Sequence, residues 1–307
     1  MENQNKAVIY TLKSGIKYNV RRQIQKIACH ILGNKIMTKI YYRIIMHGKL
    51  HLNSPILFSE KICWYKLFYC PENKKIIDCA DKYWVREYLE GKGLSKYLPD
   101  LIGVWNKAEE IDWKSLPNKF ALKCSHGCGY IAICENKELA DENEIKRKLN
   151  KWIKDDFGLY NAEPHYNLSD RKIICERFIE SDTMLPIDYK VHCFDGEAKV
   201  MLICSDRESG KTKLSFCDMN GVWLPYGYDE EHLIEIDAVN LQEMKRLSEM
   251  IAADFPFVRV DFYIERGKLK IGELTFDPAG GLFDYLNNHG DQEMGKMWNM
   301  DSLLVKR

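Results

Sequence analysis

The chain has 307 residues, 46% hydrophobic and 29% charged, so it can form one large domain or two smaller ones with a buried core. Its 45 basic and 45 acidic residues cancel, which gives no electrostatic argument for nucleic-acid binding. The eleven cysteines include no C-x-x-C pair, so reduced thiols are predicted rather than a zinc site. Neither a signal peptide nor a run of about eighteen apolar residues is present, and we expect a cytoplasmic protein.

The first 49 residues are unusually basic. Ten of them are Lys or Arg, whereas only Glu2 is acidic. Isoleucine and valine recur at helical spacing over residues 16–31 and 36–45, which predicts two amphipathic helices. We therefore expect residues 1–50 to form a basic helical arm. Two interpretations are open: the arm contacts the inner face of a membrane peripherally, or its helices pack on the domain with their basic side in water.

Several elements are then predicted in chain order. An aromatic-rich helix spans residues 58–68, and a second helix over residues 83–89 follows Asp81 and Lys82. The pattern continues with a short strand and loop at 98–105, a charged helix at 138–155, a strand at 173–180 and a hairpin at 189–204. Asp188 and Lys190 alternate onto one face of the first strand of that hairpin.

A loop of small residues interrupts the segment 120–133. A strand ending in Lys123 leads into Ser125-His126-Gly127-Cys128-Gly129, and a second strand follows. Backbone N–H groups of such a loop can cradle phosphates, and Lys123 would add a positive charge. A plain hairpin is the alternative interpretation. His126 would either contact phosphate or lie in solvent.

The most informative stretch is a second hairpin over residues 257–281. Asp261 and Glu273 lie near its open end on paired strands, close enough to share one cation. Two carboxylates with oxygen-only neighbours suit Mg²⁺. Arg259 points to the same face as Asp261, and a carboxylate pair beside an arginine is what phosphoryl transfer needs. The alternative is a surface hairpin with charges on its wet face, although the Pro-Ala-Gly-Gly tail at 278–281 would let backbone approach a ligand closely.

The order of these motifs resembles the ATP-grasp superfamily, and more narrowly its TupA-like branch, named for a teichuronopeptide biosynthesis protein. The order is a strand-borne lysine with a glycine loop, then Glu-Arg-Phe-Ile-Glu, Arg-Val-Asp and Glu-Leu-Thr-Phe-Asp-Pro. Residues 59–64, Asp81-Lys82 with Arg86, and 188–190 add to the resemblance. It implies an α+β ATP-grasp fold of two α+β subdomains that grip ATP. We expect this unit to span residues 51–307, with a lid subdomain at about 117–180.

The resemblance also implies nucleotide-binding roles. Lys123 resembles the lid lysine on the ATP phosphates, and Lys82 resembles an earlier lysine that also reaches the nucleotide. The residues that would cover the phosphates are Ser125, His126, Gly127 and Gly129. The hinge whose backbone would pair with adenine consists of Glu176, Arg177, Phe178 and Ile179. Asp188 lies where an acid usually holds the ribose. Lys190, on the same strand, is also expected to bind the cofactor.

Apart from Lys123, the residues with catalytic or metal-binding roles lie on the second hairpin. Asp261 and Glu273 match the Mg²⁺ ligands, and Arg259 matches the arginine that stabilises the transition state, with Lys123 as the second catalytic cation. Many family members carry Asn where this chain has Thr275, so a hydroxyl would ligate the metal directly or through water.

The resemblance implies an ATP-dependent carboxylate–amine ligase with ATP and Mg²⁺ as cofactors. It would phosphorylate a carboxylate and pass the acyl group to an amine, forming an amide on a uronic acid during capsule-like surface polysaccharide biosynthesis. Two alternatives stay open. A glycosyltransferase of polysaccharide assembly is disfavoured by the absence of a D-x-D triplet. A non-catalytic nucleotide-binding scaffold would need neither the acid pair nor Arg259.

Overall fold

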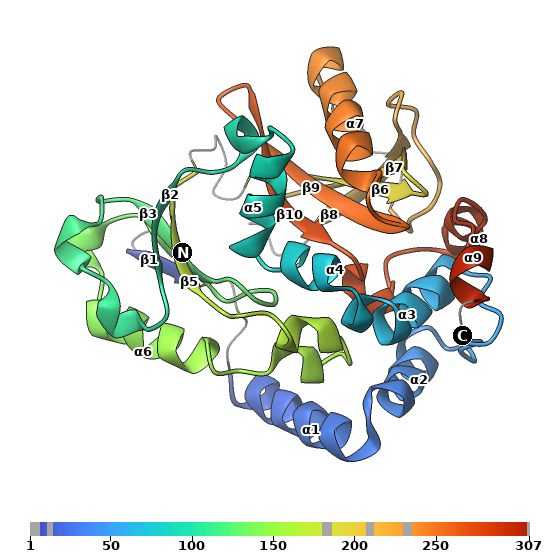
Figure 1. Cartoon of the computed structure of the whole chain (residues 1–307), viewed down its shortest axis with the longest axis horizontal. Coiled ribbons are helices and arrows are strands. Elements are labelled where there is room, and N and C mark those ends of the chain that lie inside the picture. The colour runs from blue at the N-terminus through green and yellow to red at the C-terminus, as the bar shows by residue number, and fades with distance from the viewer. Residues whose placement is uncertain (1–6, 11–14, 180–185, 207–211, 230–234, 306–307) are drawn as a thin grey trace. The chain divides into compact units, whose positions relative to one another are not determined.

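The computed structural model describes residues 7–10, 15–179, 186–206, 212–229 and 235–305. The chain divides into two compact units. The first consists of Met1–Asn34 with Lys74–Glu180, and the second of Lys35–Asn73 with Ser181–Arg307. Each unit has its own five-stranded sheet with helices beside it, which confirms the predicted α+β class (Figure 1).

The sheet of the first unit is antiparallel throughout. Its strand order is β1 (Val8–Tyr10), β4 (Ile131–Cys134), β3 (Phe120–Cys124), β5 (Ile173–Arg177) and β2 (Leu101–Trp105). The helices of this unit are α1 (Ile16–Leu32), α4 (Lys74–Cys79), α5 (Trp84–Gly91) and α6 (Glu142–Trp152). Alternate residues of β3 point to opposite faces, so Phe120 and Leu122 enter the core while Lys123 lies on the other face.

Helix α6 covers the core face of this sheet. Asp141 caps its N-terminus by accepting a hydrogen bond from the backbone N–H of Glu144. Ile145, Leu149 and Trp152 are spaced on one stripe and pack against the buried side chains of β3, β4 and β5. The opposite stripe is charged, as the sequence predicts for residues 138–155.

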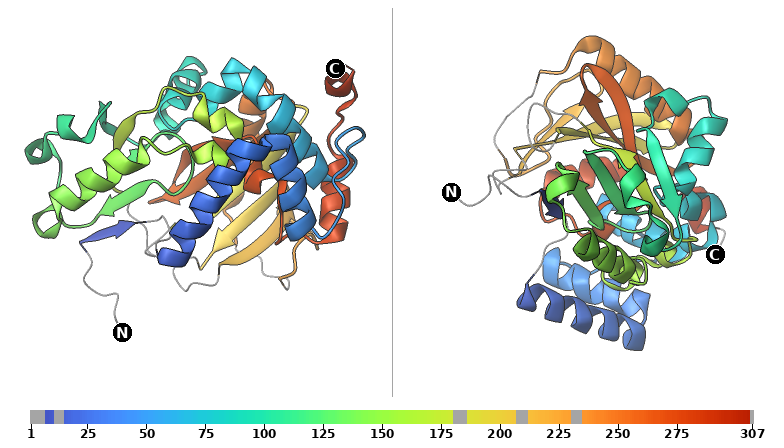
Figure 2. Two further views of the ribbon diagram at one scale, coloured as in Figure 1. Left: turned by 90° about the horizontal axis from the view of Figure 1, so that it is seen from below. Right: turned by 90° about the vertical axis from the view of Figure 1, so that its left-hand side faces the viewer.

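The sheet of the second unit is also antiparallel. Its strand order is β10 (Lys268–Thr275), β9 (Phe257–Glu265), β6 (Asp188–Phe194), β7 (Glu197–Ser205) and β8 (Lys213–Asp218). The helices are α2, which begins at the unit boundary (Asn34–Ile45), α3 (Phe58–Phe68), α7 (Ala238–Ala252), α8 (Asn288–Lys296) and α9 (Asp301–Leu304). Figure 2 shows α7 lying along this sheet.

Helix α3 packs on the face of the second sheet that carries the predicted site. Phe58 of α3 contacts His192, Phe194 and Phe257, whose side chains share that face. The small residues of Pro278–Gly281 pack against the same helix: a Cβ at Gly281 would lie 2.7 Å from the Cys63 Sγ and 2.9 Å from the Ser59 carbonyl oxygen. The close backbone approach expected of this tail is thus made to α3.

Most predicted elements are present. Helix α3 has the predicted bounds, and the hairpins β3–β4, β6–β7 and β9–β10 all form. The predictions did not include β1, β8, α4, α7, α8 or α9. All eleven cysteines lie within the described residues and are free thiols. None of the described helices combines the length and apolar character needed to cross a bilayer. The boundary expected near residue 50 stays a prediction.

Candidate functional site

The candidate site of the second unit is built as two rows of side chains across three neighbouring strands. Asp261 of β9 lies opposite Glu273 of β10 and Lys190 of β6. Two residues earlier on β9, Arg259 lies opposite Thr275 and His192. Residues two apart on a strand share a face, so strand pairing brings both rows together. A register shift between Ile271 and Glu273 sets the alignment of β10.

Arg259 and Asp261 form the centre of this site. The Arg259 Nε and Nη2 atoms each lie 2.6 Å from an oxygen of Asp261, a two-bond geometry that a guanidinium makes well. Both residues are buried, at 8% and 5% exposure. Burial alone would raise the pKa of Asp261, but Arg259 and Lys190 lower it to about 2. Asp261 is therefore fully ionised at neutral pH.

Lys190 joins this centre to a second acid. Its Nζ lies 2.6 Å from Asp261 and 3.3 Å from Asp188. Burial would lower the pKa of Lys190, but Asp261 outweighs it and the pKa is raised. The two residues predicted to bind nucleotide on β6 are thus in contact, and Lys190 is part of the Arg259–Asp261 ion-pair network.

Glu273 and Thr275 complete the predicted metal ligands. The Glu273 Oε1 lies 3.8 Å from the Arg259 Nη2, and the same nitrogen donates to the Thr275 hydroxyl at 3.1 Å. The Glu273 side chain is 36% exposed, against 7% for Asp261, so it is the more accessible of the two carboxylates. The pairing of Asp261 with Glu273 across the strands is as predicted, whereas their role as metal ligands stays a prediction.

The side chains of this set offer oxygen atoms, which are the ligands that Mg²⁺ prefers. Across the described residues, no group of three or more His, Cys, Asp or Glu side chains could hold a metal ion. Asp261 and Glu273 are nevertheless cross-strand neighbours, and a hydroxyl lies beside them. Mg²⁺ is commonly held by one or two carboxylates, with water and phosphate oxygens completing its shell. Because Arg259 and Lys190 also contact Asp261, bound metal would share that carboxylate with them.

His192 belongs to this site and was not predicted. It faces Arg259 across the β6–β9 pair and is 2% exposed. Burial and, after it, the positive charge of Arg259 lower the pKa of His192 to about 3. The ring is therefore neutral. A neutral imidazole packed beside the guanidinium adds no competing charge. The signal was in the sequence, since His192 follows Lys190 by two residues on the same strand.

The candidate site of the first unit is the loop between β3 and β4. Gly127 has φ +65°, and a Cβ there would lie 2.5 Å from the Phe157 ring, so both conformation and space require glycine. Gly129 also has a positive φ of +82°. Lys82 donates from Nζ to the Gly127 carbonyl oxygen at 2.6 Å. Lys82 thus contacts the predicted phosphate loop directly.

Asp81 and Ser125 fix the start of this loop. The Ser125 hydroxyl donates to Asp81 at 2.6 Å, and both side chains are buried. Asp81 also accepts from the backbone N–H groups of Tyr83 and Trp84 at the start of α5. The Ser125 hydroxyl accepts from the Lys172 N–H at 2.9 Å. Ser125 therefore acts inside the protein, where it holds the loop in place.

Lys123 contacts an acid of the predicted hinge. Its Nζ lies 2.5 Å from Glu176 Oε2, and Arg86 lies 3.3 Å from the other oxygen of the same carboxylate. Glu176 is 5% exposed, so it is a buried anion between two cations. Glu176 and Arg177 belong to β5, where they pair with β3. Phe178 and Ile179 follow the strand and are the hinge residues outside it.

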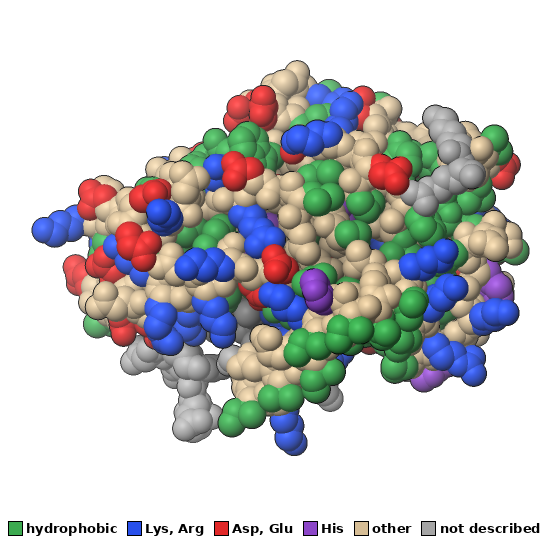
Figure 3. Space-filling model, turned by 60° about the horizontal axis from the view of Figure 1, so that its bottom comes forward, with side chains coloured by type: hydrophobic (Ala, Val, Ile, Leu, Met, Phe, Trp, Pro, Cys, Tyr) green, Lys and Arg blue, Asp and Glu red, His purple; other side chains and the backbone are tan. Residues whose placement is uncertain are grey.

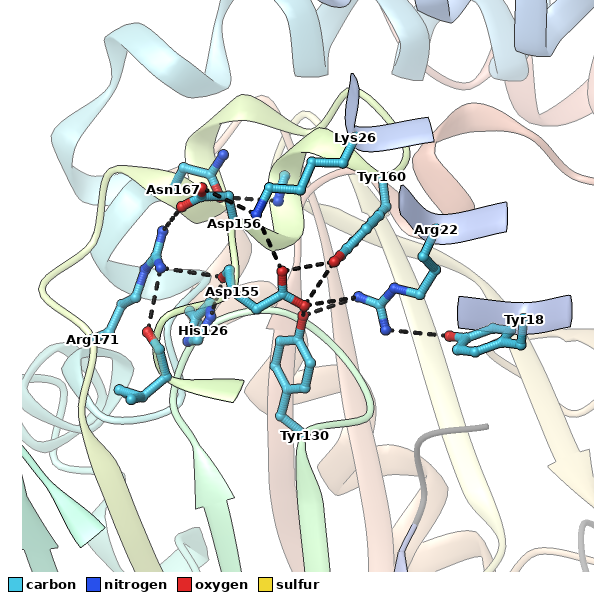
Figure 4. A network of polar contacts seen from close by, with 12 residues as sticks. Tyr18, Arg22, Lys26, His126, Tyr130, Asp155, Asp156, Tyr160, Asn167 and Arg171 are labelled. Carbon is cyan, nitrogen blue, oxygen red and sulfur yellow. Dashed lines mark hydrogen bonds and ion pairs between the residues drawn. The ribbon is translucent and has the colours of Figure 1, made fainter. Parts of the chain in front are cut away.

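His126 points into the first unit rather than into solvent. It is fully buried, and its Nε2 lies 3.0 Å from the Asp155 carbonyl oxygen. Burial, reinforced by Arg171, lowers the pKa of His126 to about 4, so the ring is neutral. The prediction that His126 could lie in solvent is therefore wrong. Figure 4 shows His126 beside Asp155, which also contacts Tyr130 at the end of the loop.

Comparison with known proteins gives a family and several distant structures. A family model described as TupA-like ATPgrasp matches residues 60–299. A search of curated proteins finds no match. Among solved structures, the D-alanine–D-alanine ligase from Bacillus anthracis, in complex with ATP, is 16% identical with a TM-score of 0.45. That match covers 75% of this chain and 64% of the ligase, so this chain spans less than two thirds of its length.

Two other ligases are similar at the same level. The D-alanine–D-alanine ligase from Helicobacter pylori is 14% identical with a TM-score of 0.44, over 78% of this chain and 69% of that chain. The L-amino acid ligase from Bacillus licheniformis is 12% identical with a TM-score of 0.41, over 67% of this chain and 42% of that chain.

Proposed function

Because the chain belongs to the TupA-like ATP-grasp family, we propose that it is an ATP-dependent carboxylate–amine ligase. The family match over residues 60–299 carries the proposal, since this span contains every nucleotide-binding and metal-binding residue predicted from the sequence.

In the first unit, cations and backbone N–H groups would bind the phosphates of ATP. Lys123 and Lys82 supply positive charge, and the loop at 125–129 supplies backbone donors. Lys82 already holds the Gly127 carbonyl, so it would position the loop as well as contact the nucleotide. Phe178 and Ile179 would present hinge backbone to adenine. In the second unit, Asp188 would accept hydrogen bonds from the ribose.

The second unit would stabilise the moving phosphoryl group. A carboxylate oxygen of the substrate attacks the γ-phosphorus, the bond to ADP breaks, and an acyl phosphate forms. The amine nitrogen then attacks the acyl carbon, phosphate leaves with the C–O electron pair, and the nitrogen releases a proton. Arg259 is ionised and directed by Asp261, so its remaining N–H groups can bind developing negative charge. Bound Mg²⁺, held by Asp261 and Glu273 with Thr275, would neutralise the phosphates.

The finer assignments rest on the TupA-like branch. The carboxylate substrate would be a uronic acid, and the product an amide in a capsule-like surface polysaccharide. Such a reaction would take place in the cytoplasm, with residues 1–50 in peripheral contact with the inner face of the membrane. Saccharide acceptors in such assembly are carried on nucleotides or lipids, and either carrier leaves the carboxylate chemistry unchanged.

An ADP-release assay tests the activity. ATP, Mg²⁺ and the protein are incubated with a panel of uronic acids and amines, and products are identified by mass spectrometry. We expect ADP, phosphate and one amide in equal amounts, and a hydroxamate when hydroxylamine replaces the amine. Arg259→Gln is the inactive control. Nucleoside diphosphate release from a nucleotide sugar without ATP would instead indicate a glycosyltransferase, and ATP binding without turnover on any acid would indicate a scaffold.

A further inference from the structure

Helix α1 packs on its unit with the polar side inward. Arg22 is 7% exposed, donates to the Tyr130 hydroxyl at 2.9 Å, and lies 3.6 Å from the centre of the Tyr160 ring (Figure 4). The Asp155 Oδ2 lies 3.6 Å from the Arg22 Nη2, and the Asp155 Oδ1 lies 3.5 Å from the Lys26 Nζ. These contacts anchor the helix through charge and aromatic rings. The prediction that the basic side lies in water with the isoleucines packed is therefore wrong for these residues.

The outward side of α1 is apolar. We define the α1 apolar face as five side chains at helical spacing on one stripe, namely Ile16, Val20, Ile24, Ile27 and Ile31. Each is between 52% and 84% exposed. Figure 3 shows hydrophobic side chains gathered in a line where the lower edge of Figure 1 comes forward. Single exposed apolar residues are ordinary, whereas a contiguous stripe marks an interaction surface.

The charges around this face select the kind of partner. Lys17 and Arg21 are exposed and border the apolar stripe. No Asp or Glu occurs between Glu2 and Glu60. A second copy of α1 would bring like charges together, which disfavours self-association. A membrane that contains anionic lipid offers an apolar layer to the isoleucines and valine of the stripe, and negative headgroups to the cations at its border.

We propose that the α1 apolar face inserts into the interfacial layer of a membrane containing anionic lipid, with Lys17 and Arg21 against the headgroups. The inference goes beyond the ligase chemistry because it names the surface that binds and the side chains that enter the bilayer. Helix α2 has a similar exposed row, Ile36, Ile40 and Ile44, bordered by Lys39 and Arg43. Because α2 belongs to the second unit, the proposal rests on α1 alone.

Vesicle co-sedimentation of the full chain tests the proposal without using activity. The vesicles are phosphatidylcholine with about one third phosphatidylglycerol, or phosphatidylcholine alone, at about 0.05 M and about 0.5 M salt. We expect binding to the anionic vesicles that falls at high salt. Ile24→Ser combined with Ile27→Ser should weaken it at least tenfold, roughly as expected when two aliphatic side chains leave the interface. Lys17→Glu with Arg21→Glu should remove the salt dependence.

Matched controls separate insertion from general loss of apolar or basic surface. Leu139→Ser removes an exposed apolar side chain of the same unit, and Lys151→Glu reverses an exposed charge on α6. Neither should change vesicle binding, and circular dichroism should show that every variant is folded. Equal binding by the Ile24→Ser, Ile27→Ser protein, or no binding by the intact chain at low salt, overturns the proposal. Concentration-dependent dimers abolished by the same substitutions would assign the face to a second copy instead.

Discussion

The two candidate sites are held together in different ways. In the second unit, Arg259, Asp261 and Glu273 are placed by the pairing of neighbouring strands. In the first unit, the loop at 125–129 is held by side chains from other segments, such as Asp81 and Lys82. A strand ladder fixes its own neighbours, whereas a loop depends on contacts with residues far away in sequence. The first arrangement suits fixed charges, and the second suits a phosphate-covering loop that must admit its ligand.

The largest effect is expected in the strand-built site. Glu273→Gln should lower the rate of ADP release by about 10²–10³-fold, because one charge of the predicted metal-binding pair disappears. Stability should change little, since the Glu273 side chain is 36% exposed. Asp261→Asn should cost similar activity and also about 3–5 kcal/mol of unfolding free energy, because Arg259 and Lys190 lose a buried partner.

Steady-state kinetics at saturating Mg²⁺, together with urea unfolding, separate these two losses. Glu265→Gln, an acid at the far end of β9, is the control and should keep full activity. Normal turnover of Glu273→Gln would refute its assignment as a metal ligand.

The next effect is expected in the loop-built site. Lys123→Ala removes a cation from the predicted phosphate-binding set, so ATP affinity should fall about 10–100-fold and turnover should slow. Glu176 keeps Arg86 as a partner, which limits the loss of stability. Isothermal calorimetry measures the affinity. Lys151→Ala, a substitution at an exposed position of α6, serves as the control. Unchanged affinity and turnover would show that the β3–β4 loop is a structural hairpin.

A glycine comparison tests how each region tolerates a methyl group. Gly127→Ala meets Phe157 at 2.5 Å in a backbone with φ +65°, whereas Gly267→Ala in the β9–β10 turn has φ +73° and nothing within 4 Å. In both variants the left-handed backbone conformation of the new alanine should cost about 1–2 kcal/mol of stability. Only Gly127→Ala should also displace the loop, so its Michaelis constant for ATP should rise several-fold. Similar kinetics for both variants would contradict a required close fit at Gly127.

The last prediction concerns stability: the burial of His126 should make the free energy of unfolding depend on pH. Its pKa in the folded state is about 4, below the ordinary 6.5, so the unfolded chain binds more protons between these values. The free energy of unfolding should therefore fall as pH drops from about 6.5 toward 4, by at most about 1.4 kcal/mol per pH unit. His126→Gln should reduce this slope in thermal unfolding and leave the part that comes from His192, whereas His289→Gln, an exposed position, should not change it. An unchanged slope in His126→Gln would refute the assignment.

The contrast between the two sites also explains what the sequence could predict. Asp261 and Glu273 follow from strand alternation and a short turn, both visible in one stretch of chain. The Asp81–Ser125 hydrogen bond joins residues 44 positions apart, which no local pattern encodes. The helical arm was predicted, but not which side of α1 packs, because the decisive contacts of Arg22 are with Tyr130 and Asp155.

Helix α7 was missed for a different reason. Its buried residues Met244, Leu247 and Ile251 recur at helical spacing, so the apolar stripe was present in the sequence but no helix was predicted from it. Packing on the sheet stabilises the helix once the tertiary structure exists. Short strands such as β1 and β8 depend in the same way on a neighbouring strand.

The position of Asp155 has a consequence for how the sequence can diverge. One carboxylate accepts hydrogen bonds from Tyr130 and Tyr160 and lies within ion-pair distance of Arg22 and Lys26, while the carbonyl of the same residue contacts His126. A substitution of Asp155 removes, in one step, a carboxylate that both tyrosine hydroxyls and the buried Arg22 contact. Homologous chains should therefore exchange these residues together or keep them together. Inheritance of the inward face of α1 would then be tied to inheritance of the β3–β4 loop.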